Sequence, residues 1–427
     1  MRTLYHIIIA AALIAALPYV LLRSAINPAF REDMMRRLDS WKDVPFYSGC
    51  IWIHAASMGE VRIAKTLIEQ FRESYGEDRP IILSTFTLTG YQLAMELGMP
   101  KVFRMPPDLA FFIRPLLEKL DPSVVVLVEA ELWPSLLKVC EERNVPVLVL
   151  NGRISRKSFR RYRLVKRIFQ WLTRAVTQFA VRSQTDADYL YQLGTAKDKV
   201  LVTGNMKFDA LTVAMGGPHP ERDLFASVIF VSTRPGDEEP ILDAIVRLKK
   251  DHPEAQFVLA PRHTHRVEEI ERMVSQRGLK YALHSQLSAE DVDGQPGLIL
   301  VNEMGTLDQY YRRACVAYVG GGFNPKFGGQ NILEPALYSL PVIFGKHMNN
   351  FHDEARLLVQ SGGGIQIKNA EELFAALSDL LSNRGKTRKL GERALETVRL
   401  NRGATKKNAE LILKTLNEMS DLKTAAL

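Results

Sequence analysis

Cysteine is scarce in this chain, which has only Cys50, Cys140 and Cys315 among its 427 residues and no CxxC spacing. A disulfide framework and a cysteine-ligated zinc site are therefore excluded, and the composition fits a reducing compartment. The chain also lacks the GxGxxG fingerprint, the GxxxxGK[ST] phosphate loop and the GxSxG nucleophile elbow. These absences exclude the commonest dinucleotide, nucleoside-triphosphate and hydrolase motifs.

Acidic residues are too few in one half of the chain to balance the basic ones. Residues 1–215 contain 29 Lys and Arg against 21 Asp and Glu, whereas residues 216–427 contain 27 of each. The first half therefore carries the whole net charge of +8. Such an excess favours an anionic partner: nucleic acid, phospholipid or a phosphorylated substrate.

The N-terminus holds a long apolar run, because residues 4–22 contain no Asp, Glu, Lys or Arg. As a helix this run would span roughly 28 Å, about one hydrocarbon core. We expect residues 1–24 to form a membrane anchor; a cleaved signal peptide is the alternative, although no clear small-x-small cleavage site follows. The basic residues directly after the run predict that the bulk of the chain faces the cytoplasm. They are Arg23, Arg31, Arg36, Arg37 and Lys42.

Apolar strand patterns alternate with helical patterns along the rest of the chain, which is typical of a buried parallel sheet. A Gly- and Pro-rich stretch at 216–220 interrupts the alternation and predicts two α/β domains, residues 25–215 and 216–427. In such sheets, ligands bind outside the carboxyl ends of the strands. The predicted strands are residues 50–54, 81–85, 124–129, 145–151, 179–181, 200–203, 228–232, 256–260, 297–301, 314–319 and 341–344.

Glu60 follows the first predicted strand, at the end of the stretch "IHAASMGE". Ser57 and Glu60 fit the Ser-x-x-Glu capping box, so Glu60 is either a helix cap or a general base. We expect the helix start to lower the pKa of the carboxyl group and to keep it ionised. An ionised carboxylate at this strand end is able to accept a proton from a hydroxyl group.

Two further strand ends of the first domain carry charged residues. Glu129 and Glu131 follow the strand at 124–129, and Lys207 follows the strand at 200–203. A solvated acidic pair and a surface lysine are the structural alternatives. Their places at strand ends make binding or catalytic roles possible.

Polar and Gly-rich loops follow the strands of the second domain. They contain Thr233 in the stretch at 232–239, Arg262 after the strand at 256–260, Gly321 in a run of three glycines, and Asn331 before a helix. Glycines next to a helix N-terminus expose backbone N–H groups to phosphate. His263 and His265 lack an apparent third metal ligand, so we expect no metal site. The Asp-x-Asp pairs at 186–188 and 291–293 are interpreted as solvated surface.

A strongly basic stretch spans residues 151–167, with eight Lys and Arg among Ile, Phe, Tyr, Leu and Val. A solvated helix and a nucleic-acid surface are alternatives. Together with an apolar anchor, the pattern favours an anionic membrane or a phosphorylated lipid. The basic residues assigned to this role are Arg153, Arg156, Lys157, Arg160 and Arg161.

Eight segments in sequence order together resemble the 3-deoxy-D-manno-octulosonic acid (Kdo) transferases of lipopolysaccharide and lipid A biosynthesis. They are "WIHAASMGE", "VEAELWPSLL", "NGRISRKSFRRY", "VTGNMKFD", "APRH", "MGTLDQYY", "YVGGGF" and "NILEPA". The resemblance implies an α/β fold of the GT-B type, with two Rossmann-like domains facing a cleft: an acceptor domain at 25–215 and a donor domain at 216–427 that includes the C-terminal helices. It also implies an inverting, metal-independent transfer of Kdo from CMP-Kdo to a lipid A precursor, lipid IVA, with no cofactor.

The resemblance also assigns residues. The general base is Glu60, and Glu129 and Lys207 stabilise the transition state. Thr233 and Gly321 are possible donor-loop residues. The CMP-binding residues are Pro261, Arg262, Met304, Gly305, Thr306, Asn331, Ile332, Leu333 and Glu334.

The chain departs from the family pattern in the donor domain. A loop that often reads Ser-Thr-His-x-Gly-Glu-Glu has Arg234 in place of His, Thr306 stands where an acid is frequent, and "NILEP" replaces "NPLEA". We expect a location at the cytoplasmic face of the cell inner membrane and no nucleic-acid partner. A GT-B transferase for another nucleotide sugar, and a non-catalytic binder of anionic lipid, remain alternatives.

Overall fold

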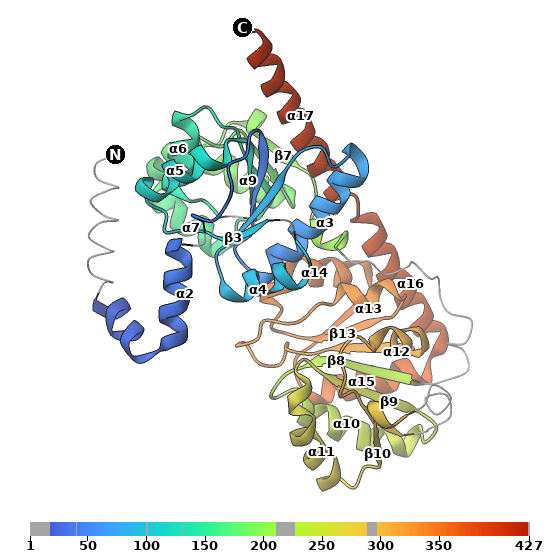
Figure 1. The fold of residues 1–427 in the computed structure, drawn as a ribbon. Helices are drawn as coiled ribbons and strands as arrows, with labels where there is room; N and C mark the ends of the chain where they lie inside the picture. Colours follow the sequence, from blue (N-terminus) through green and yellow to red (C-terminus); the bar gives the residue numbers. More distant parts are fainter. Residues whose placement is uncertain are drawn as a thin grey trace. The chain divides into compact units, whose positions relative to one another are not determined.

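A computed structural model describes residues 18–39, 41–99, 101–129, 131–210, 227–287 and 297–425. The chain divides into two compact units: residues 1–210 with 402–427, and residues 211–401. Each unit is built around one parallel β-sheet with helices packed on it (Figure 1). The expected pair of parallel α/β domains is therefore confirmed.

Over the described residues, the sheet of the first unit has seven strands in the order β3-β2-β1-β4-β5-β6-β7, and all neighbours are parallel. The strand order reverses between β1 and β4, so loops at their carboxyl ends diverge and leave a place for a ligand. The strands are β1 (Cys50–His54), β2 (Ile81–Thr85), β3 (Val102–Arg104), β4 (Pro122–Val128), β5 (Val147–Gly152), β6 (Gln178–Val181) and β7 (Val200–Val202).

Two apolar cores cover the two faces of this sheet, because side chains alternate along each strand. On β1, Trp52 belongs to one core, and Ile51 and Ile53 belong to the other. The helical elements are α2 (Pro28–Asp39), α3 (Met58–Tyr75), α4 (Leu88–Glu96), α5 (Ala110–Leu120), α6 (Pro134–Glu142), α7 (Arg156–Leu164), α8 (Lys166–Thr173), α9 (Gln184–Leu193), η1 (Lys197–Lys199), η2 (Met206–Phe208) and α17 (Ala404–Ala425).

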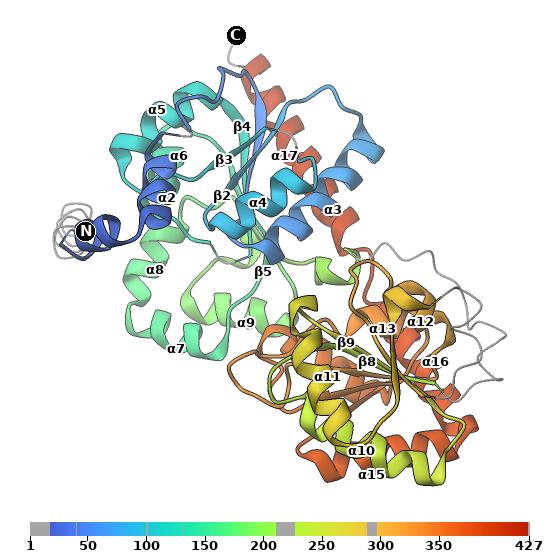
Figure 2. The same ribbon diagram turned by 60° about the horizontal axis from the view of Figure 1, so that its bottom comes forward.

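The C-terminal helix α17 belongs to the first unit, which differs from the sequence-based assignment of all residues after 215 to the second domain. It lies against α3 in both views (Figures 1 and 2). Ile412 and Leu416 are buried in the core that α3 covers. The carboxylate of Asp209 accepts hydrogen bonds from the N–H groups of Gly403 and Thr405, both at 2.7 Å, and so caps the start of α17.

In the part of the second unit that the structure describes, the sheet also has seven parallel strands, in the order β10-β11-β9-β8-β12-β13-β14. Its order reverses between β8 and β12. The elements are β8 (Ser227–Thr233), α10 (Glu238–Asp251), β9 (Gln256–Pro261), η4 (Thr264–Arg266), α11 (Val267–Gln276), β10 (Tyr281–Leu283), η5 (His284–Gln286), β11 (Leu298–Leu300), α12 (Leu307–Arg313), β12 (Val316–Val319), α13 (Leu333–Leu337), β13 (Val342–Gly345), η7 (Asn349–Phe351), α14 (His352–Ser361), β14 (Gly364–Ile367), α15 (Ala370–Ser382) and α16 (Arg384–Leu400).

The expected membrane anchor at residues 1–24 lies largely outside the described residues, which begin at residue 18. In the part of the chain that the structure describes, no helix combines the length and hydropathy needed to cross a bilayer.

Candidate active site

Glu60 lies in the first turn of α3, directly beyond the carboxyl end of β1. Its Oε2 accepts a hydrogen bond from the Ala56 N–H at 2.8 Å, and its Oε1 accepts one from the Ser57 hydroxyl at 2.7 Å. The predicted capping box is therefore incomplete: Ser57 makes no side-chain cap bond to the helix and donates to Glu60 instead. These two hydrogen bonds hold the carboxylate, and Glu60 as a whole is only 7% exposed.

The expectation that Glu60 has a lowered pKa is wrong. Burial raises the pKa of Glu60 to about 7, against the hydrogen bond from Ser57, which lowers it. The charges of Glu129 and Glu131 raise it further. The effect of burial on the pKa of Glu60 is larger than the opposite effect expected from the helix N-terminus, because desolvation disfavours the charged form.

Glu129 follows β4 in a left-handed conformation, with φ at +65°, so the strand ends before it. Its Oε1 accepts a hydrogen bond from the guanidinium group of Arg182, which is the first residue after β6. Arg182 is 7% exposed, and its Nε also donates to the backbone oxygen of Asn151 at 3.1 Å. Glu129 is therefore one half of a partly buried ion pair. The nearby Glu131 has a raised pKa, mainly because it is buried and secondly because of the charge of Glu129.

Lys207 lies in the short helix η2, beyond β7 at the same sheet edge. The backbone N–H of Lys207 donates a hydrogen bond to Oδ1 of Asn205 at 3.0 Å. The backbone N–H of the preceding residue, Met206, donates to Oδ1 of Asn151 at 2.9 Å. Asn151 is fully buried at the end of β5. The carboxyl edge of the sheet thus carries Glu60, Glu129, Arg182 and Lys207 on the loops after β1, β4, β6 and β7.

Sequence reasoning missed Arg182 and His54. Arg182 carries no motif, since its partner Glu129 lies 53 residues away in the chain. His54 ends β1, is fully buried, and lies 2.8 Å from the Ser84 hydroxyl through Nδ1. Burial lowers the pKa of His54 to about 3, so its imidazole is neutral. For His54, the signal in the sequence was its position in the stretch "IHAASMGE", which also contains Glu60.

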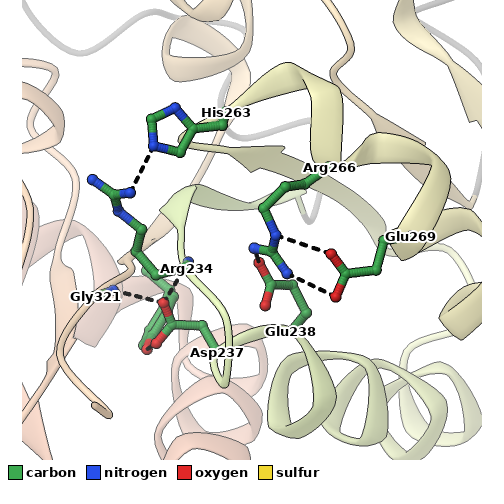
Figure 3. Close-up of polar contacts among 8 residues, drawn as sticks. Arg234, Asp237, Glu238, His263, Arg266, Glu269 and Gly321 are labelled. Atoms are coloured by element: carbon green, nitrogen blue, oxygen red, sulfur yellow. Dashed lines mark hydrogen bonds and ion pairs between the residues drawn. The ribbon is translucent and has the colours of Figure 1, made fainter. Parts of the chain in front are cut away.

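The second unit brings three loops together at the carboxyl ends of β8, β9 and β12 (Figure 3). Buried Asp237 joins two of them, because its Oδ2 accepts hydrogen bonds from the N–H groups of Arg234 at 2.7 Å and Gly321 at 2.6 Å. The Arg262 N–H donates to the Thr233 oxygen at 3.1 Å and joins the third. Burial raises the pKa of Asp237 to about 6.

Glycine at position 320 permits this close approach. A Cβ atom there would lie 2.5 Å from the Cα of Thr233. Thr233, Gly321 and Arg262, all predicted from the sequence, thus share one edge of the sheet.

The other predicted nucleotide-binding residues occupy loops at the same edge. Met304, Gly305 and Thr306 lie between β11 and α12, and Met304 is 70% exposed. Pro261 ends β9. The segment at 331–334, which includes Ile332 and Glu334, starts α13 in the connection after β12, where Oδ1 of Asn331 accepts from the Leu333 N–H at 3.1 Å.

The basic stretch forms the exposed surface of α7 and the start of α8. Arg156, Lys157, Arg160 and Arg161 are exposed, while Arg153 is half-buried. Phe159 anchors α7 by stacking on Tyr189, with ring centroids 4.4 Å apart. Beyond the basic side chains, the corner between the two helices exposes Leu164, Val165 and Ile168.

One surface assignment is wrong. Asp186 is 5% exposed, and its Oδ1 accepts from the Ile154 N–H at 2.8 Å, so it fixes the loop before α7. The second Asp-x-Asp pair, at 291–293, lies outside the described residues. Over those described, no group of three or more His, Cys, Asp or Glu side chains is arranged to hold a metal ion.

The chain is similar to known proteins over most of its length. A family profile described as 3-deoxy-D-manno-octulosonic-acid transferase (kdotransferase) matches residues 31–210. A 3-deoxy-D-manno-octulosonic acid transferase of Haemophilus influenzae is 30% identical over 391 residues, which cover 89% of this chain and 90% of the relative. A bifunctional glycosyltransferase/methyltransferase of Fusobacterium nucleatum is 33% identical over 86% of this chain, and the chain spans 58% of that relative's length.

Among solved structures, MurG of Acinetobacter baumannii superposes with a TM-score of 0.56 at 12% identity, covering 86% of this chain and all of MurG. A likeness at this identity shows the shared fold alone, two parallel-sheet α/β domains. The family is shown by the Haemophilus relative, which is 30% identical to this chain over nearly the full length of both proteins. The chain belongs to the Kdo transferases, a family of glycosyltransferase enzymes.

Proposed function

We propose that the enzyme transfers Kdo from CMP-Kdo to a lipid A precursor, lipid IVA, with inversion and with Glu60 as general base. The observation that carries this proposal is the Glu60 carboxylate. It is fixed by Ala56 and Ser57 at the carboxyl end of β1, where the strand order reverses, and its pKa is raised to about 7. A general base is most effective when its pKa lies near the working pH.

In the proposed step, a hydroxyl oxygen of the acceptor attacks the anomeric carbon of Kdo while Glu60 takes the hydroxyl proton. The bond between the anomeric carbon and the CMP phosphate breaks, and the phosphate leaves with the electron pair. The transition state is oxocarbenium-like by analogy with glycoside hydrolysis. Glu129 and Lys207 stabilise it from the neighbouring loops, and the ion pair with Arg182 holds the Glu129 carboxylate in position.

We assign CMP to the second unit. The loops after β8, β9, β11 and β12 carry Thr233, Arg262, Met304 to Thr306, Gly321 and Asn331 to Glu334. Their convergence at the sheet edge and the backbone link between Arg262 and Thr233 support this assignment. Arg262 and backbone N–H groups stabilise the charge of the departing phosphate. The proposed chemistry uses no metal ion or cofactor.

We assign the acceptor and the membrane surface to the first unit. The exposed basic side chains of α7, next to exposed Leu164, Val165 and Ile168, match a phosphorylated lipid at an anionic bilayer surface. The proposed location is the cytoplasmic face of the cell inner membrane, with residues 1–24 as the anchor.

Mass analysis of the product tests the function. Purified full-length protein is incubated with CMP-Kdo and tetraacylated lipid IVA, and the expected product is heavier by one or more Kdo units. Transfer from another nucleotide sugar and none from CMP-Kdo would favour a different transferase. No turnover of any donor together with tight lipid binding would favour a lipid-binding protein.

A further inference from the structure

Cationic side chains gather on the loops that follow the paired strands β8 and β9. Arg234 comes from the first loop, and Arg262 and Arg266 come from the second, with His263 beside them. Like charges this close repel one another unless carboxylates or a bound anion compensate them. The cluster therefore raises the question of which cation has a counter-charge within the protein.

Arg266 has its counter-charge. Its guanidinium lies between two carboxylates, 2.5 Å from Oε1 of Glu238 and 3.1 Å from Oε2 of Glu269 (Figure 3). Burial is the largest single influence on the pKa of Arg266 and lowers it. The hydrogen bonds and charges of Glu238 and Glu269 together outweigh burial, so the pKa is raised overall. Arg266 is therefore a structural cation that ties α10 to α11.

Arg234 has no such counter-charge. Within the described part of the chain its guanidinium forms no ion pair, and its Nε is buried without a hydrogen-bond partner. The neighbouring Asp237 is occupied by the N–H groups of Arg234 and Gly321 and by the Tyr318 hydroxyl at 3.1 Å. Burial, followed by the charges of Arg262 and Arg266, lowers the pKa of Arg234, and the charge of Asp237 offsets only part of this effect.

His263 fixes the direction of the Arg234 side chain. Nη1 of Arg234 lies 2.7 Å from Nε2 of His263 (Figure 3). The guanidinium also lies over the Phe327 ring, 5.3 Å from its centroid. A guanidinium group only donates, so Nε2 of His263 must accept and the imidazole must be neutral. Burial and then Arg234, Arg262, His265 and Arg266 lower the pKa of His263, in agreement with a neutral ring.

We propose that Arg234, held in place by His263, binds anionic oxygens of the nucleotide-sugar donor beside Arg262. An anion at this point supplies the ion-pair partner that the described residues do not give Arg234, and the planar guanidinium matches the oxygens of a phosphate or carboxylate group. The inference rests on the proposed function, and it gives a role to the residue at which this chain departs from the Ser-Thr-His pattern. The anion is the phosphate of CMP or the carboxylate of Kdo.

Calorimetric titrations of the full-length protein with cytidine, CMP and CMP-Kdo test the proposal. Arg234→Gln should lower the affinity for the anionic ligands about 10–100-fold, the usual effect of losing a hydrogen bond to a charged group. Its affinity for cytidine should stay unchanged. Arg234→Lys, which keeps the charge and loses the planar fork, should fall between Arg234→Gln and wild type. Arg272→Gln removes an exposed charge from α11 and serves as the control.

The three ligands distinguish the two anions. A loss for both CMP and CMP-Kdo assigns Arg234 to the phosphate, and a loss for CMP-Kdo alone assigns it to the sugar carboxylate. Unchanged affinity for both anionic ligands, or an equal loss that includes cytidine, overturns the inference. If the wild-type protein binds neither CMP nor CMP-Kdo, the proposed function fails first and the inference fails with it.

Discussion

At the residue scale, Glu60 combines two demands that usually conflict. Its hydrogen bonds to Ala56 and Ser57 hold the carboxylate in one orientation, while burial and the neighbouring Glu129 and Glu131 make ionisation costly. A cap alone has no use for a raised pKa. A base that must take a proton near neutral pH does, so the raised pKa of Glu60 favours the proposed general base over a helix cap alone.

Glu60→Gln separates the cap from the base. The amide oxygen accepts the hydrogen bond from the Ala56 N–H, and the amide NH2 group donates to the Ser57 hydroxyl oxygen in place of the second bond. The amide cannot take a proton, so turnover should fall roughly 10²–10⁴-fold while the protein still folds. Wild-type turnover should rise with pH through about 7 as Glu60 ionises. Initial rates at pH 5.5–8.5 measure both effects, and a flat wild-type profile over this range would contradict the assignment.

The same variant changes the pH dependence of stability. The pKa of Glu60 is raised from 4.5 to about 7 in the folded state, so its proton stabilises the fold fully below pH 4.5, and this stabilisation is lost as the pH rises through 7. Relative to Glu60→Gln, the wild type should therefore lose stability between pH 5 and 8. Urea unfolding of both proteins at several pH values provides the measurement.

We expect Arg182 to act as a positioning residue for the proposed site through its ion pair with Glu129. Arg182→Gln removes the cation that pairs with Glu129, so the local negative potential grows and the pKa of Glu60 should rise further. The pH–rate midpoint should move to higher pH, with a stability loss of about 1–3 kcal/mol because Glu129 keeps partial solvent contact. Arg174→Gln, on an exposed side chain, is the control. An unshifted midpoint with lowered stability would make Arg182 merely structural.

At the element scale, the strands that sequence patterns missed are all at sheet edges. β3, β10 and β14 are three or four residues long and each has a single strand neighbour. Central parallel strands are buried on both faces and read as continuous Val, Ile and Leu, whereas a short edge strand needs no such run. The central strands at 50–54, 81–85 and 256–260 were predicted within a residue of their bounds for the same reason.

The packing of helix α17 on the first unit, which the sequence did not predict, can be tested by substitution. Ile412 is 1% exposed in the core beneath α3, so Ile412→Ala should cost the first unit about 2–5 kcal/mol. Lys414→Ala on the same helix removes a 72% exposed side chain and should have little effect. Thermal unfolding followed by calorimetry compares the two. Equal, small effects would mean that α17 is not part of the core.

At the scale of the whole molecule, charge divides the chain in the way the proposed function requires. The first half carries the entire net charge of +8, and eight of its basic residues lie in the stretch at 151–167. The second half is neutral overall, yet it concentrates cations at one sheet edge. The proposed surface for an anionic lipid and the proposed compact site for one nucleotide would use positive charge in different ways.

Changing Arg156, Lys157, Arg160 and Arg161 together to Gln tests the surface. Each exposed basic residue near an anionic bilayer contributes about 1 kcal/mol, so affinity for anionic vesicles should fall strongly at low salt and the loss should shrink at high salt. Neutral vesicles should show no difference. The matched control changes Arg384, Lys386, Arg388 and Lys389 on α16, which removes the same charge from the second unit. An equal loss of vesicle affinity in both variants would mean that the effect depends on net charge alone and would contradict a specific role for α7.

The sequence by itself determined the two parallel sheets, the strand ends that carry Glu60, Glu129 and Lys207, and the loops of the second unit. Each of these depends on patterns among consecutive residues. Only the tertiary structure decided the pairing of Arg182 with Glu129, the pKa of Glu60 and the return of α17, because each depends on burial or on partners far apart in the chain. Strand order, which brings β4 beside β1 and β6 next to β5, sets those neighbours, and no local pattern encodes it.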